Sequence, residues 1–219
     1  MVIDLSHVIT SGMVTYKGLP APHICDFLSR DASRQHYAPG TEFHIGQVNM
    51  VGNTGTYIDC PFHRYEDGQD FTEMKLERFT HLPALVFRHD YQKKGLAIGP
   101  DMFLGQRLKG RAVLLCTGWS RHWGVDAYYT LHPFLTEEAA RYLVIQGVTL
   151  VGIDSHNIDD TRSNTRPVHT ILLRQEILIV EHLTNLDQVP DGGNWYFHAV
   201  PPKIKGMGTF PVRAFMSDF

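Results

Sequence analysis

The feature that most constrains the fold is a series of short apolar runs in the second half of the chain. Residues 112–116, 148–153 and 177–180 consist almost entirely of aliphatic side chains and are flanked by polar residues or glycine. Runs of this length are typical of strands buried on both faces of a helix-covered sheet. Between the first two runs, Thr136 precedes two glutamates and an apolar stripe ending near Gly147, which predicts a capped helix. The pattern therefore predicts a strand–helix–strand unit and an α/β fold.

The remaining segments predict further strands joined by polar turns. The polar segment 30–40 is expected to be an exposed connection, and residues 157–167 are too polar to be anything but a loop. Extended segments are expected at residues 2–5, 23–27, 43–50 and 212–216. No repeat or linker divides the chain, and 219 residues are enough for one large core. We therefore expect one domain, residues 1–219, built on a mixed sheet with helices.

Composition excludes several classes of function. The net charge of −3 offers no basic field for nucleic acid or an anionic membrane surface. No apolar run approaches the roughly 20 residues of a membrane-spanning helix, and Asp4 interrupts the first apolar stretch, which argues against a secretory signal. The three cysteines, Cys25, Cys60 and Cys116, lack metal or redox spacing. These features predict a soluble cytoplasmic protein without nucleic-acid or membrane partners.

The segment most informative about chemistry is residues 53–63, Asn-Thr-Gly-Thr-Tyr-Ile-Asp-Cys-Pro-Phe-His. Asp59 and His63 can both bind a metal or carry a proton, and Gly55 and Pro61 restrict the backbone around them. Spacing alone fits a strand end with a capping aspartate and a loop histidine equally well. The chain holds 13 histidines, which is unusually many, but most histidines serve structural roles.

The same segment resembles the motif His-x-Gly-Thr-His-x-Asp-x-Pro-x-His of the bacterial cyclase / kynurenine formamidase family, which includes isatin hydrolases. Asn53 and Tyr57 replace two of the motif histidines. The motif residues that remain are Gly55, Thr56, Asp59, Pro61 and His63. The resemblance continues at residues 167–173, which include His169, at Glu181, and at residues 3–6 and 117–119. It therefore covers nearly the whole chain.

The resemblance implies a fold, a reaction and a metal site. The fold would be the swivelling β/β/α domain of the family, assembled as a homodimer or larger homo-oligomer. The reaction would be hydrolysis of a C–N bond in an amide, aryl formamide or cyclic amide, with N-formylkynurenine or another aromatic amide as the small-molecule substrate. By position, the ligands of Mn²⁺ or Zn²⁺ would be Asp59, His63, His169 and Glu181. His63 would also be the proton carrier, and Asp59 would be the second catalytic residue.

The two replaced histidines leave three hypotheses. Tyr57 could bind a metal only as a phenolate, and Asn53 offers only a carbonyl oxygen. Asp59, His169 and Glu181 still supply three ligands, enough for one catalytic ion that activates water, with His63 as fourth ligand or general base. The carboxylates favour Mn²⁺, although Zn²⁺ suits the set as well. The alternatives are a metal-free enzyme that uses the same side chains, and a small-molecule binding protein without catalysis.

Other residues are candidates for the substrate pocket. Asn53 and Tyr57 lie in the motif, while Trp119 and His156 each follow a predicted buried strand. Loop packing explains Trp119 equally well, and a structural hydrogen bond is the simpler role for His156. A substrate carboxylate could pair with an arginine, although exposed arginines are common, and the candidates are Arg64, Arg162 and Arg166. No G-x-S-x-G elbow, P-loop or zinc-finger spacing occurs.

Overall fold

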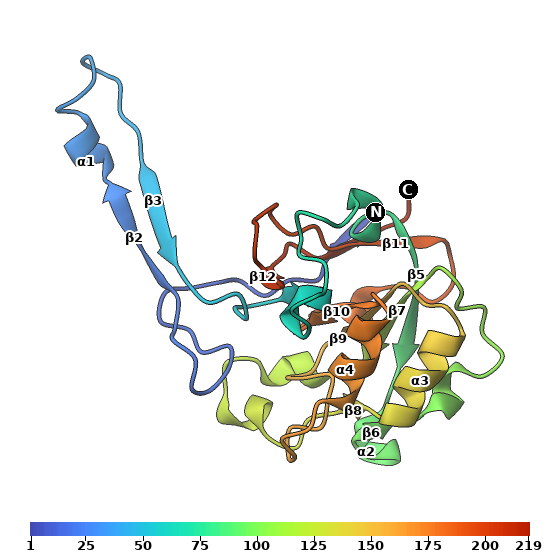
Figure 1. The fold of residues 1–219 in the computed structure, drawn as a ribbon. Helices are drawn as coiled ribbons and strands as arrows, with labels where there is room; N and C mark the ends of the chain where they lie inside the picture. The colour runs from blue at the N-terminus through green and yellow to red at the C-terminus, as the bar shows by residue number, and fades with distance from the viewer.

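The computed structural model describes residues 1–219, and its centre is a nine-stranded sheet in the order β1-β13-β11-β5-β7-β9-β10-β4-β12 (Figure 1). The four middle strands β5, β7, β9 and β10 are parallel, and every other pairing in this sheet is antiparallel. The strands are β1 Val2–Asp4, β4 Tyr57–Asp59, β5 Leu82–Arg88, β7 Ala112–Cys116, β9 Leu150–Ile153, β10 Leu178–Glu181, β11 Trp195–His198, β12 Thr209–Pro211 and β13 Phe215–Ser217. The predicted α/β fold with a mixed sheet is confirmed.

Alternation along the central strands divides the core into two clusters. In β7, Val113 and Leu115 join one cluster, whereas Leu114 joins the other on the opposite face. The first cluster also contains buried residues of helices α3 (Glu137–Ile145) and α4 (Pro167–Arg174), which pack against each other. The sheet therefore carries two helices on one face, and α4 lies beside the strand β10 that leads into the candidate site.

Several predicted elements are present, with shifted boundaries. The Thr136 hydroxyl accepts a hydrogen bond from the Ala139 N–H, as expected for the cap of α3. The expected strand at 212–216 is wrong in its bounds, because β12 ends at Pro211 and β13 begins at Phe215. Between them the Ala214 N–H bonds to the Ser6 hydroxyl rather than to a neighbouring strand. The segment 30–40 is also not entirely a connection, since it holds the one-turn helix α1 (Arg30–Ser33).

A hairpin arm, residues 23–49, projects away from the body of the molecule (Figure 1). It consists of β2 (His23–Leu28) and β3 (Ile45–Asn49), paired antiparallel, with α1 near the tip. The smaller elements of the body are β6 Ala97–Ile98, β8 Phe134–Leu135, α2 Tyr91–Lys94 and the 3₁₀ turns Pro61–His63, Leu76–Arg78, Pro100–Phe103, Trp119–His122, Asp126–Tyr129 and Leu186–Gln188. None of the helices combines the length and apolar character that crossing a bilayer requires.

Candidate active site

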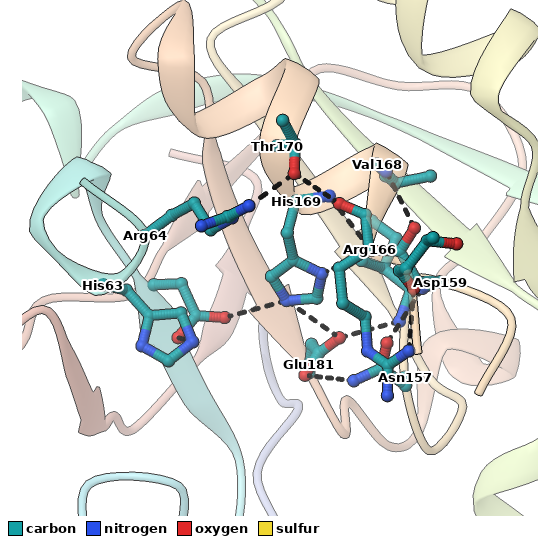
Figure 2. Close-up of polar contacts among 12 residues, drawn as sticks. His63, Arg64, Asn157, Asp159, Arg166, Val168, His169, Thr170 and Glu181 are labelled. Atoms are coloured by element: carbon teal, nitrogen blue, oxygen red, sulfur yellow. Dashed lines mark hydrogen bonds and ion pairs between the residues drawn. The ribbon is translucent and has the colours of Figure 1, made fainter. Parts of the chain in front are cut away.

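The candidate residues meet where β4 and β10 lie side by side. The two strands are antiparallel, with Ile179 opposite Asp59 and Glu181 opposite Tyr57. His63 ends the 3₁₀ turn that directly follows β4, and His169 lies in the first turns of α4. Figure 2 shows the side chains of His63, His169 and Glu181 converging from these three elements. The fold thus brings together residues that are far apart in the sequence.

A close backbone approach holds the turn that carries His63. A Cβ atom added to Gly208 would lie 2.2 Å from the backbone nitrogen of His63, so only glycine fits there. This contact allows β12 to lie directly against the turn, and the Cys60 N–H donates to the Gly208 carbonyl at 2.8 Å. The next residue, Thr209, is thereby placed beside both Asp59 and His63.

Asp159 fixes the orientation of His169. The Nδ1 atom of His169 lies 2.6 Å from Oδ2 of Asp159, and the same carboxylate accepts the backbone N–H groups of Val168 and His169. The carboxylate holds the proton on Nδ1, so Nε2 points toward the strands. Nε2 lies 3.7 Å from Oδ2 of Asp59 and 3.7 Å from Oε1 of Glu181 (Figure 2). A carboxylate behind a ligating histidine is a common arrangement in metal sites.

A threonine hydroxyl connects Asp59 with His63. The Oγ1 atom of Thr209 donates to Oδ1 of Asp59 at 2.6 Å and lies 2.6 Å from Nδ1 of His63. Because a hydroxyl has one proton to donate, Thr209 accepts the second bond from the Nδ1–H group of His63. Nε2 of His63 then carries the lone pair, and this side chain is 34% exposed. His63 is therefore held in the form that can accept a proton or bind a cation.

Glu181 is buried and is bonded to donors of the chain. The Tyr57 hydroxyl donates to Oε2 at 2.5 Å, and the Ile158 N–H donates to Oε1 at 2.7 Å. Burial raises the pKa of Glu181 to about 7. Burial, reinforced by Glu181 and Asp59, raises the pKa of Tyr57 well above its ordinary value of 10. Tyr57 therefore acts as a phenol that donates to Glu181, and not as a phenolate ligand.

The geometry of the donors fits one divalent cation. Ligand atoms of Asp59, His63 and His169 all lie within 4.8 Å of one another. Two ligands bound to one ion at about 2.1 Å in tetrahedral geometry are roughly 3.4 Å apart, close to the 3.7 Å that separates His169 Nε2 from the carboxylate oxygens of Asp59 and Glu181. Glu181 is not one of these three residues, although its Oε1 atom also lies 3.7 Å from His169 Nε2. Oδ2 of Asp59 is also buried without any hydrogen-bond partner, which a cation would provide.

The buried charges require compensation. Burial lowers the pKa of His169, but the hydrogen bond to Asp159 and the nearby carboxylates of Asp59 and Glu181 outweigh burial and raise it to about 10. Without a cation, a protonated His169 therefore balances part of the negative charge of Asp59, Asp159 and Glu181. A divalent ion would take over this role, because a metal-ligating imidazole must be neutral at the bonding nitrogen.

A cavity of about 960 Å³ opens over these residues. The predicted site residues that line it are Asn53, Tyr57, His63, His169 and Glu181. Asp59 is fully buried and does not line it, and neither do Trp119 and His156. Trp119 is buried and its Nε1–H donates to the Tyr128 carbonyl, while His156 lies behind Tyr16, a lining residue whose ring is 4.4 Å away. The structure therefore brings Asn53, Tyr57 and His63 of the motif to the cavity, but not these two loop candidates.

Three contributors to the site were not identified from the sequence. Asp159 lies in the polar loop that follows β9, Thr209 begins β12, and Tyr16 belongs to a loop near the N-terminus. Asp159 has a local signal, since an aspartate ahead of a helix that begins with proline can accept its first N–H groups. Thr209 has none, because its partners Asp59 and His63 lie about 150 residues earlier.

Comparison with known proteins places this architecture in a family. Residues 3–160 match the Cyclase family model, described as "Putative cyclase". The chain is 32% identical over 184 residues to the kynurenine formamidase of Geobacillus thermodenitrificans, covering 83% of this chain and 84% of that protein. The structure described as a "predicted metal-dependent hydrolase from Bacillus stearothermophilus" has 28% identity and a TM-score of 0.78, with 100% of this chain and 98% of the other covered.

A second solved structure extends the likeness in fold. Isatin hydrolase A from Labrenzia aggregata superposes with a TM-score of 0.84 at 22% identity, covering 100% of this chain and 94% of that one. At this level of identity the likeness concerns the fold alone. Together with the family model and the formamidase relatives, the site geometry leads to one conclusion: the chain belongs to the cyclase family and is a hydrolytic enzyme.

Proposed function

We propose that the protein hydrolyses a C–N bond in an amide, aryl formamide or cyclic amide, with one Mn²⁺ or Zn²⁺ as cofactor. The observation that carries this proposal is the unpaired, fully buried Oδ2 atom of Asp59, which faces the Nε2 atom of His169. Such an atom needs a cation to offset its desolvation. The formamidase relative supports the choice of an amide as substrate.

The ligands in this proposal are Asp59, His169 and Glu181, contributed by β4, α4 and β10. A divalent ion bound there would polarise the substrate carbonyl and make water more acidic. Asp159 orients the His169 ring through Nδ1 so that Nε2 faces Asp59 and Glu181, and the Tyr57 phenol holds Oε2 of Glu181 in place. Tyr57 thus supports a ligand at a motif position where the resemblance implies a histidine.

His63 is the proton carrier in this proposal. Its Nδ1–H group is bonded to Thr209, so Nε2 is available to accept a proton from the attacking water. The same atom can then return the proton to the leaving nitrogen. General base and acid catalysis of this kind contributes about 10²- to 10⁴-fold in rate. The partial exposure of His63 places this nitrogen at the cavity, where the substrate would bind.

An aromatic amide suits the lining of the cavity. Tyr16, Leu19 and Ile171 contribute apolar surface, and Asn53 can bond to a polar group of the substrate. Trp119 is too deeply buried to take part without rearrangement. The proposed substrate class is therefore a small aryl amide, of which N-formylkynurenine is an example.

A hydrolysis screen tests the proposal. Formanilides, cyclic amides and lactones are incubated with chelator-treated enzyme, alone or with added Mn²⁺ or Zn²⁺. Release of amine or ring-opened acid that depends on the added metal supports the proposal. Equal turnover in the presence of chelator would instead indicate a metal-free enzyme. Ligand-induced thermal stabilisation without any product would indicate a binding protein.

We further propose that two or more copies of the chain associate through the hairpin arm, and that residues 1–219 act as one hydrolase domain. Side chains of the arm such as Phe27, Phe43 and Val48 are more than half exposed. An isolated two-stranded hairpin is marginally stable in water, so a second copy would cover it. The three cysteines are all free thiols, which supports a reducing, cytoplasmic location.

A further inference from the structure

The cavity contains four fixed cations, and two of them are neutralised by acids. Lys17 Nζ lies 2.9 Å from Oδ1 of Asp126, and Nη2 of Arg141 lies 2.6 Å from Oε1 of Glu137. Each of these two cations therefore already has an acidic partner. The other two fixed cations of the lining, Arg64 and Arg166, form no ion pair in the structure.

Arg64 and Arg166 are bonded only to neutral groups. The Nε–H of Arg64 donates to the Thr170 hydroxyl at 3.3 Å. Nη1 of Arg166 donates to the backbone carbonyls of Ser163 and Thr165 at 2.7 and 2.8 Å. These bonds fix one side of each guanidinium group and leave its remaining N–H donors available. Both side chains are therefore oriented, but their charge is not compensated.

Both arginines lie beside the proposed reaction centre. Arg64 directly follows His63, and Arg166 stands three residues before His169 at the start of α4. Figure 2 shows the two side chains on opposite sides of the His169 ring. The carboxylates that also line the cavity are already engaged, Glu137 by Arg141 and Glu181 by Tyr57. No acid of the chain competes for the two guanidinium groups.

We propose that Arg64 and Arg166 bind an anionic group of the substrate, so that the preferred substrate is an aryl amide carrying a carboxylate. This rests on the proposed hydrolysis at the same site and adds the charge of the substrate to it. A guanidinium group binds a carboxylate through paired, charge-assisted hydrogen bonds. The carboxylate would lie between the arginines, with the scissile amide directed toward His63 and Asp59.

The test compares two substrates that differ in one group. N-formylanthranilate carries a carboxylate next to the formamide, and formanilide has hydrogen there. We expect wild-type enzyme to show a kcat/KM at least about tenfold higher for the anionic compound. Arg64→Gln and Arg166→Gln should each lower this ratio by about 10- to 100-fold, the range expected for losing a hydrogen bond to a charged group. The matched control is Arg141→Gln, a cavity arginine already paired with Glu137.

The outcomes separate this inference from the proposed function. A ratio near one in wild type, or a ratio that neither variant changes, would overturn the inference while hydrolysis itself stands. An equal fall of this ratio in Arg141→Gln would also overturn it, since the overall positive charge of the cavity would then explain the preference for the anionic substrate. If wild type hydrolyses neither compound, the affinities of the enzyme for anthranilate and for aniline are measured by calorimetry instead. Preference for anthranilate that disappears in Arg64→Gln supports the inference, and equal or absent binding refutes it.

Discussion

The candidate site and the hairpin arm show opposite ways of using side chains. Asp59 and Glu181 are completely buried, although both carry ionisable carboxyl groups, and each accepts a hydrogen bond from another element. On the arm, Phe27 is 72% exposed and Phe43 is 53% exposed, although both are apolar. Burying ionisable groups at the site and exposing apolar groups on the arm are both unfavourable for a chain without a bound partner.

Each region lacks a partner that its side chains require. A buried carboxylate without a full set of partners calls for a cation, and an exposed apolar hairpin calls for a covering surface. The site is the better defined of the two, because the bond between Thr209 and Asp59 and the bond between Asp159 and His169 fix its donors. The arm is held by the pairing of β2 with β3 and by local contacts such as the His44–Asp26 pair and the bond from the Phe43 N–H to the Ser33 hydroxyl.

The largest effect is expected from Asp59→Asn. The amide keeps the volume and can still bond to Thr209, but it removes the negative charge that would bind the cation. We expect kcat/KM to fall by about 10³-fold or more, together with loss of metal uptake. Steady-state kinetics and elemental analysis of the same preparation measure both. Asp160→Asn, which alters only an exposed pair with Arg162, is the control and should change neither.

The second prediction concerns the arm and uses the double variant Phe27→Lys and Val48→Lys. Introducing charges at an apolar contact between copies should raise the dissociation constant of the oligomer by about 100-fold or more. Light scattering coupled to gel filtration over a range of concentrations reads out the mass. Ile145→Ser replaces an equally exposed apolar side chain on α3 and serves as the control. A wild-type protein that remains monomeric throughout would rule out this role for the arm.

A further difference between the regions concerns acid stability. Burial lowers the pKa of His156 to about 3, whereas an unfolded histidine titrates near 6.5. The unfolded chain thus binds an extra proton between these values, so stability is complete above pH 6.5 and is lost as the pH falls. The free energy of unfolding of wild type should fall between pH 7 and 4.5. We expect this fall to be about 2 kcal/mol smaller in His156→Gln. Urea unfolding in chelator measures this.

His36→Gln, an exposed position on the arm, is the comparison for that experiment. It should leave the difference between the two pH values unchanged. If both variants behave as wild type does, burial of His156 does not contribute to acid sensitivity.

The smallest effect is expected from Thr209→Val, which keeps the shape of the side chain but removes the hydroxyl. Asp59 and His63 would lose their shared partner, and His63 would no longer be restricted to one tautomer. We expect kcat to fall by about tenfold, with KM changing little. A pH profile of kcat should shift as well, because the proton-accepting group has changed. Thr72→Val, at a half-buried threonine that donates to the carboxylate of Asp70 in the same way, is the matched control.

Local sequence patterns predicted the elements whose cause is local. The apolar run at β7 and the Thr136 cap of α3 both reflect interactions within a few residues. Helix α4 had comparable signals, with Pro167 at its first position and Val168 and Leu172 on one face, yet it was not predicted. Residues 157–166, which precede this helix, are polar, so the sequence did not show where the loop ends and the helix begins.

The site could be predicted only in part. Motif resemblance pointed to Asp59, His63, His169 and Glu181, and the fold brings ligand atoms of the first three within 4.8 Å of one another, with Glu181 Oε1 3.7 Å from His169 Nε2. It could not indicate that Tyr57 donates to Glu181, because that bond joins residues 124 positions apart. Thr209 is a similar case. Such contacts depend on the sheet order, in which β4 lies between β10 and β12, and no local pattern encodes that order.

The metal content of the protein at neutral pH tests most directly whether the site binds a divalent ion. Chelator-treated wild-type protein is loaded with Mn²⁺ or Zn²⁺, passed through a desalting column and analysed by elemental mass spectrometry beside Asp59→Asn. We expect about one equivalent of metal per chain in wild type and almost none in the variant. A wild-type content below about 0.2 equivalents with both metals would contradict the claim that these donors bind a divalent ion.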